Sequence, residues 1–125
     1  MASGGFPLKI ERKEIKPGVV VLVMTGRIQM GPDCKQIEKR VEELIATSEN
    51  RVVFDLTGVH ILDSSGVGQI VTCFSKLKKT GGALRLAGVG GMLAGTLKMT
   101  HVDQVIEIYP TALAAAEDFG PNGGA

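Results

Sequence analysis

Two neighbouring serines, Ser64 and Ser65, are the side chains of this sequence best placed to undergo chemistry. They lie between Asp63 and Gly66, shortly after an apolar run that predicts a buried strand over residues 51–56. The order of strand, short loop and Asp-Ser-Ser-Gly predicts a helix that begins at about Gly66 with hydroxyl groups at its N-terminus. The dipole and the free N–H groups of a first helical turn stabilise negative charge. A phosphate on one of these serines would be tolerated there, so the segment is a candidate switch.

Two glycines, Gly66 and Gly68, separate this pattern from an ordinary helix start. Asp and Ser are common N-caps, so Asp63 and the serines also have a purely structural interpretation. Glycine inside a helix costs about 1 kcal/mol relative to alanine. Two glycines therefore weaken the helix where a cap should strengthen it. Such a conflict indicates a functional position, for example one that another backbone or surface approaches closely.

The elements around the serines alternate between strand and helix. An antiparallel hairpin is predicted from strands over 8–12 and 19–24, joined at Lys16-Pro17-Gly18. The other predicted strands are 51–56, 83–87 and 105–108, and the predicted helices are 32–48, 66–79, 92–99 and 112–118. This order indicates the α/β class, with a mixed but mostly parallel sheet, an N-terminal hairpin and about four helices. A sheet this small would allow all the helices to lie on one face.

The composition favours a single globular domain and argues against several function classes. The chain has 125 residues, of which 44% are apolar, and a net charge of +1, so no basic surface for direct nucleic-acid binding is indicated. The apolar run over 19–24 is too short for membrane insertion, and no signal peptide is apparent. We therefore expect a cytoplasmic protein with a domain over residues 8–119 and flexible termini at 1–7 and 120–125.

The remaining side chains of chemical interest are two cysteines and two histidines: Cys34, Cys73, His60 and His101. The cysteines fall on apolar helix faces, which predicts buried free thiols. The histidines are predicted in loops, and their spacing does not indicate a metal site. The glycine-rich turn over 88–91 has the outline of a dinucleotide-binding loop, but Leu93 stands where a third glycine is required. No catalytic group and no cofactor are expected.

The segment Asp63-Ser64-Ser65-Gly66-Val67-Gly68 and its preceding strand resemble the signature of STAS-domain proteins, specifically bacterial anti-sigma factor antagonists. The Thr25-Gly26 pair after a buried strand and the Gly81-Gly82 pair before a short strand fit the same family. The resemblance spans residues 8–119. It implies a single STAS-type domain that acts through protein partners and not as an enzyme.

The resemblance implies a partner-switching mechanism. In this family the unphosphorylated antagonist binds an anti-sigma factor that is also a serine kinase, and this binding releases a sigma factor. The kinase phosphorylates the first serine of the motif, and a phosphoserine phosphatase reverses the reaction. Carried onto this chain, the acceptor is Ser64, with Ser65 as the alternative. The implied partner-binding residues are Asp63, Ser64, Ser65, Gly66, Val67, Gly68 and Gln29.

Gln29 is a departure from the family pattern, because many antagonists carry an acidic residue at this position. A glutamine can hydrogen-bond near the acceptor serine but supplies no charge. This difference slightly favours an alternative, a STAS scaffold or transport-associated interaction module that is not phosphorylated. A third hypothesis is a small nucleotide-binding protein that uses the loop at Gly88. For the antagonist, we expect docking through the loop over 25–31 and the helix after Ser64, especially Val67, Gln69 and Thr72 where they are exposed.

Overall fold

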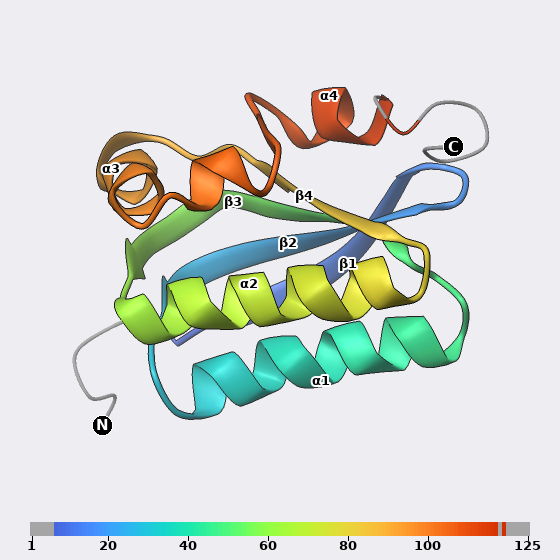
Figure 1. Cartoon of the computed structure of the whole chain (residues 1–125), viewed down its shortest axis with the longest axis horizontal. Coiled ribbons are helices and arrows are strands. Elements are labelled where there is room, and N and C mark those ends of the chain that lie inside the picture. The colour runs from blue at the N-terminus through green and yellow to red at the C-terminus, as the bar shows by residue number, and fades with distance from the viewer. Residues whose placement is uncertain (1–6, 118, 120–125) are drawn as a thin grey trace.

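The computed structural model describes residues 7–117 and 119 and consists of one β-sheet with helices on both faces (Figure 1). Its elements are β1 (Lys9–Lys16), β2 (Val19–Ile28), α1 (Pro32–Ala46), β3 (Arg51–Leu62), α2 (Ser64–Lys79), β4 (Ala83–Ala87), α3 (Gly91–Met99), the 3-10 turn η1 (Val102–Gln104), β5 (Ile108–Tyr109) and α4 (Ala112–Glu117). The five strands lie in the order β1-β2-β3-β4-β5. Only the β1–β2 pair is antiparallel. The predicted α/β fold with its N-terminal hairpin is confirmed.

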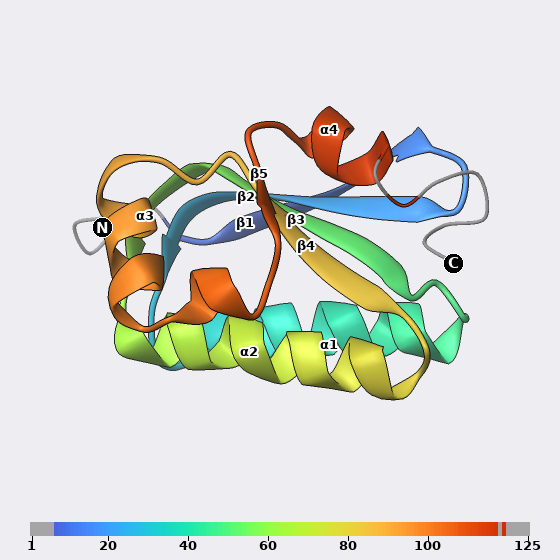
Figure 2. The ribbon, with the colours of Figure 1, turned by 45° about the horizontal axis from the view of Figure 1, so that its top comes forward.

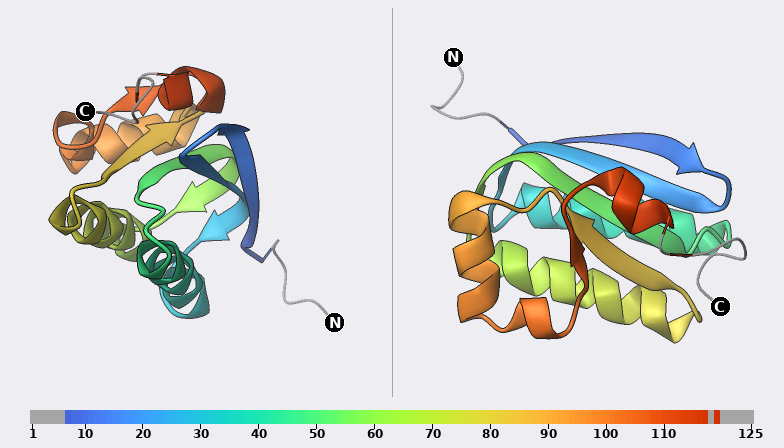
Figure 3. Two further views of the ribbon diagram at one scale, coloured as in Figure 1. Left: turned by 90° about the vertical axis from the view of Figure 1, so that its right-hand side faces the viewer. Right: turned by 90° about the horizontal axis from the view of Figure 1, so that it is seen from above.

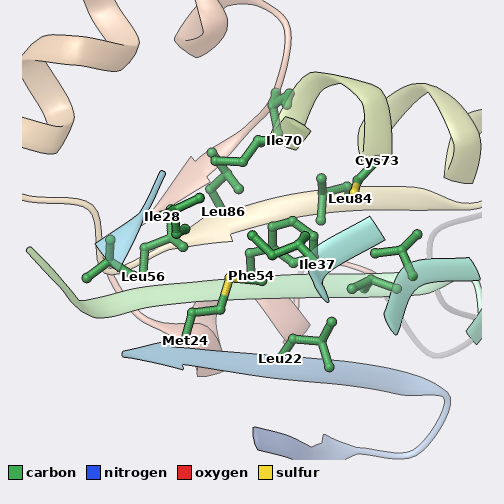
Figure 4. Close-up of a cluster of buried hydrophobic side chains, with 14 of the residues drawn as sticks. Leu22, Met24, Ile28, Ile37, Phe54, Leu56, Ile70, Cys73, Leu84 and Leu86 are labelled. Atoms are coloured by element: carbon green, nitrogen blue, oxygen red, sulfur yellow. The ribbon is translucent and has the colours of Figure 1, made fainter. Parts of the chain in front are cut away.

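The main core lies between the sheet and the layer formed by α1 and α2 (Figure 2). Figure 4 shows the side chains that fill it, from β2, β3, β4 and the two helices: Leu22, Met24, Ile28, Phe54, Leu56, Leu84, Leu86, Ile37, Ile70 and Cys73. Leu93 and Leu97 of α3 extend the same core. This packing holds the first turn of α2 against the ends of β2 and β3.

The expectation that all helices lie on one face is wrong, because α4 covers the opposite face of the sheet (Figure 3). A second buried cluster lies there: Val19, Val21, Val53, Ala87, Ala112, Ala115, Ala116 and Phe119. The physical reason is visible in β2, whose consecutive apolar residues place valines on both sides of the sheet. Both faces of the central strands therefore need a cover.

The strands that lead to the serines are longer than the predicted 19–24 and 51–56. β2 and β3 stay paired up to Ile28 and Leu62, through two irregularities of register. Gly58 does not end the strand: a Cβ there would lie 2.5 Å from Cγ2 of Thr25, so glycine permits close packing of the pair. As a result β3 continues to the residue before Asp63, and α2 begins at Ser64 instead of near Gly66.

The last predicted strand, over 105–108, is mostly wrong. β5 contains only Ile108 and Tyr109, and the preceding chain forms η1. The N–H group of Ile106 donates to the carbonyl of Val102 at 2.9 Å, so a turn buries Ile106. The start of the helix predicted over 112–118 is confirmed: α4 begins at Ala112, and the Thr111 hydroxyl accepts the N–H of Ala114 at 3.1 Å as an N-cap.

The predicted flexible termini, apart from Pro7, lie outside the described residues. Within the part of the chain that the structure describes, no helix combines the length and apolar character needed to cross a membrane.

An exposed ion pair joins the hairpin to the connection between α1 and β3 and gives a pH prediction. Arg12 donates two hydrogen bonds to Glu49, one of 3.1 Å between Nη1 and Oε1. The hydrogen bond from Arg12, with a second from Thr47, lowers the pKa of Glu49 to about 2. The stabilisation is present above the ordinary pKa of 4.5 and is lost as pH falls towards 2. Since both groups are partly hydrated, it amounts to less than about 1 kcal/mol.

Arg12→Ala should therefore lower the free energy of unfolding by up to about 1 kcal/mol at pH 7, and by less at pH 3. Urea unfolding at the two pH values measures both differences. Lys13→Ala, which removes the exposed neighbouring cation, is the control and should show no such pH dependence. An equal loss for Arg12→Ala at both pH values would contradict the ion-pair explanation.

Candidate functional site

Asp63 connects the two chain segments that form the candidate site. Its Oδ1 accepts the N–H of Gly66 at 2.8 Å, which makes it the N-cap of α2. Its Oδ2 accepts the N–H of Met30 at 3.1 Å, and its own N–H donates to the carbonyl of Ile28 at 3.3 Å. The predicted capping role is confirmed. The carboxylate also fastens the β2–α1 loop to the start of α2.

The two serines occupy different environments at this helix start. Ser64 is exposed, and its hydroxyl has no hydrogen-bond partner among residues 7–117 and 119. Ser65 is half-buried, and its carbonyl lies 3.6 Å from the thiol of Cys34 on α1. Of the two candidate acceptors, Ser64 therefore presents the more accessible hydroxyl.

The two glycines of the motif have different reasons to be glycine. A Cβ on Gly66 would lie 2.8 Å from the carbonyl oxygen of Ile28 and 2.7 Å from Cδ1 of Leu62. The close approach predicted from the sequence exists at this residue, and the approaching backbone belongs to β2. Gly68 is exposed, and a Cβ there would meet nothing within 4 Å. The fold of the chain therefore does not explain Gly68.

Val67 and Gly66 cannot offer much surface to a partner. Val67 is only 6% exposed and packs in the main core, and Gly66 is also buried. They belong to the buried side of the helix and fix its first turn against the core. The exposed residues of the motif are Ser64 and Gly68, and Asp63 and Ser65 are half-exposed.

The loop between β2 and α1 completes the site. The predicted loop over 25–31 is shortened to Gln29–Gly31, because β2 continues to Ile28. Gln29 is half-buried; its backbone N–H donates to Oδ2 of Asp33 at 3.1 Å, and its backbone carbonyl accepts the thiol of Cys34 at 3.4 Å. Met30 lies within the predicted docking loop but was not singled out from the sequence; it is 75% exposed.

Comparison with known proteins identifies the fold family. A family model described as the STAS domain matches residues 12–115. The chain belongs to the STAS domain family. The predicted resemblance is thereby confirmed, and it covers most of the chain.

The relatives of this STAS domain include named anti-sigma factor antagonists. A Thermotoga neapolitana protein, provisionally named an anti-sigma factor antagonist homolog, is 26% identical over 114 residues, 90% of this chain and 96% of that protein. The crystal structure of an anti-sigma factor antagonist from Mycobacterium paratuberculosis matches with a TM-score of 0.77 at 25% identity, covering 87% of this chain and 91% of that one. Phosphorylated SpoIIAA of Bacillus matches with a TM-score of 0.70 at 15% identity, covering 90% and 100%, which shows the shared fold.

The thiols of this STAS domain are poor nucleophiles. Burial raises the pKa of Cys73 to about 11. Burial also raises the pKa of Cys34, with a smaller contribution from Asp63 and Asp33. Cys34 is half-buried, so the predicted full burial is correct only for Cys73.

His60, predicted in a loop, lies exposed in β3.

The double role of Asp63 can be tested with Asp63→Asn. An asparagine keeps one oxygen for the Gly66 N–H but turns an NH₂ group towards the N–H of Met30, so two donors face each other. We expect the free energy of unfolding to fall by about 1–2 kcal/mol, as measured by urea denaturation. Asp103→Asn, at an exposed aspartate of η1, is the control. Equal stability of the two variants would show that the bond to Met30 contributes nothing.

Proposed function

We propose that this STAS domain is an anti-sigma factor antagonist that binds a kinase-type anti-sigma factor, so that a sigma factor is released in the cytoplasm. Phosphorylation of Ser64 by the kinase ends this binding, and a phosphoserine phosphatase restores it. The observation that supports the proposal most directly is the Ser64 hydroxyl, exposed at the first residue of α2 beside the N-cap Asp63. The names of the relatives point to the same function.

The position of Ser64 suits a phosphate that changes binding without changing the fold. A phosphoserine adds about −1.5 to −2 charges and three acceptor oxygens. The N-terminus of a helix stabilises this charge, and the exposed side chain needs no repacking. In an interface the same charge would be desolvated next to the carboxylate of Asp63, which is unfavourable. The domain would thus stay folded while the complex dissociates.

Although Gln29 carries no charge, two acidic side chains lie at the site. The carboxylate of Asp33 lies 3.1 Å from the N–H of Gln29, and that of Asp63 is bonded to the next residue. Two aspartates therefore hold the loop beside the acceptor helix. For this reason we favour the phosphorylated antagonist over the unphosphorylated scaffold, which remains the alternative.

The proposal is tested by incubating the protein with ATP and the kinase-type anti-sigma factor of its own genome, followed by intact-mass spectrometry. The wild type and Ser65→Ala should gain the mass of one phosphate, and Ser64→Ala should gain none. A phosphoserine phosphatase should remove the added mass.

Two other results would change the proposal. Full phosphorylation of Ser64→Ala would refute the assignment of the acceptor. Absence of both phosphorylation and binding for the wild type would favour the scaffold alternative, in which the domain associates with a large assembly regardless of Ser64.

A further inference from the structure

Met30 is an exposed apolar side chain on a loop whose backbone is held in place. Its side chain is 75% exposed, while its N–H is bonded to Oδ2 of Asp63 at 3.1 Å. The preceding residue, Gln29, is held in the same way by Asp33 at 3.1 Å. Because this backbone is already fixed, the loop itself loses little further conformational freedom when it binds a partner. Methionine is also enriched at protein interfaces.

The surface that adjoins Met30 is hollow and carries positive charge. A hollow of about 430 Å³ lies over the start of α1, lined by Gly31, Pro32, Lys35, Gln36 and Lys39. Lys35 and Lys39 are exposed. The carboxylates of Asp33 and Asp63 do not line this hollow; they accept backbone N–H groups of the loop and of α2. An acidic protein surface is therefore the complementary partner.

The hollow and the acceptor serine lie at the same end of the molecule. Figure 1 shows the starts of α1 and α2 side by side, and the contact of Cys34 with the carbonyl of Ser65 at 3.6 Å joins them. Met30 is linked to the same helix start through Asp63. One partner can thus cover Ser64, Met30 and the hollow together.

We propose that Met30 inserts into an apolar pocket of the kinase-type anti-sigma factor, and that Lys35 and Lys39 face acidic side chains around that pocket. This inference rests on the proposed function and adds the chemistry of the partner. It also gives a reason for the strength of the switch. A phosphate on Ser64 would enter an interface whose other side is acidic, so repulsion adds to desolvation.

Binding to the purified anti-sigma factor, measured by surface plasmon resonance at two salt concentrations, tests both parts. Met30→Gln should weaken binding about tenfold or more, because the side chain that the partner would bury becomes polar. Lys35→Glu combined with Lys39→Glu should slow association and reduce its dependence on salt. Thermal unfolding should show that these variants remain folded, since all three side chains are exposed.

The matched controls lie away from the hollow. Met99→Gln changes a methionine of α3 that is 81% exposed, and Lys13→Glu with Lys79→Glu makes the same change in net charge. Binding should be unchanged in these controls. If the wild type binds but Met30→Gln and Met99→Gln bind equally well, the inference is overturned while the proposed function stands. If the wild type does not bind the anti-sigma factor, both fall together.

Discussion

Phosphorylation of Ser64 should weaken binding of this STAS domain to the proposed anti-sigma factor partner by more than a hundredfold, and Ser64→Asp by about tenfold or more. The physical reason is a charge placed at an exposed helix start that the partner desolvates. A coupling of about 3 kcal/mol is enough for the larger effect. Aspartate gives the smaller effect because it carries about half the charge of a phosphoserine. Titration calorimetry with the purified partner measures both.

The control for this prediction is Ser75→Asp, a second exposed serine on α2. It adds the same charge to the same helix, away from the helix start, and should bind like the wild type. The thermal stability of Ser64→Asp should not fall, because an acidic residue in the first helical turn is favourable. Equal binding by Ser64→Asp and Ser75→Asp would contradict the switch.

The two glycines of the motif should respond to alanine in opposite directions. Gly66→Ala places a Cβ 2.8 Å from the carbonyl oxygen of Ile28, so the ends of β2 and α2 must separate. We expect a loss of about 2 kcal/mol in the free energy of unfolding, typical of overpacking. Gly68→Ala meets open space, and should gain about 0.5–1 kcal/mol from helix propensity. Urea denaturation of both variants measures the difference.

The binding of the stabilised variant then shows whether Gly68 has a function. Gly68→Ala should weaken binding to the proposed anti-sigma factor, because the added methyl group would prevent the partner from approaching the helix backbone closely. Gly95→Ala is the matched control: it also meets open space in a helix, α3, and should stabilise the fold without affecting binding. Unchanged binding of Gly68→Ala would show that the partner does not approach this residue.

Much of the candidate site can be predicted from short segments of sequence. Three helix starts follow from local sequence. Asp63 and Thr111 each accept a backbone N–H three residues later, and Pro32 occupies a first helical position. Gly81 likewise marks a helix end, with a φ of +82° that favours glycine. The motif after β3 also sufficed to predict the STAS family, which the family model confirms.

Other features depend on contacts between distant segments, so the sequence alone did not reveal them. The position of α4 on the second face follows from how the sheet packs. The close approach at Gly66 was predicted, but strand pairing decides that the approaching backbone is that of Ile28. The second bond of Asp63 reaches Met30, which is 33 residues away. That bond depends on the β2–β3 register, which pairs Ile28 with Leu62.

The sequence by itself therefore determined where the candidate acceptor serine lies and which helix carries it, because capping and hydrophobic periodicity are local properties. Only the tertiary structure decided what surrounds Ser64: a clamped loop, an exposed methionine and one glycine with free space above it. These neighbours are brought together by strand pairing and core packing over long sequence distances, and a one-residue change of register would separate them.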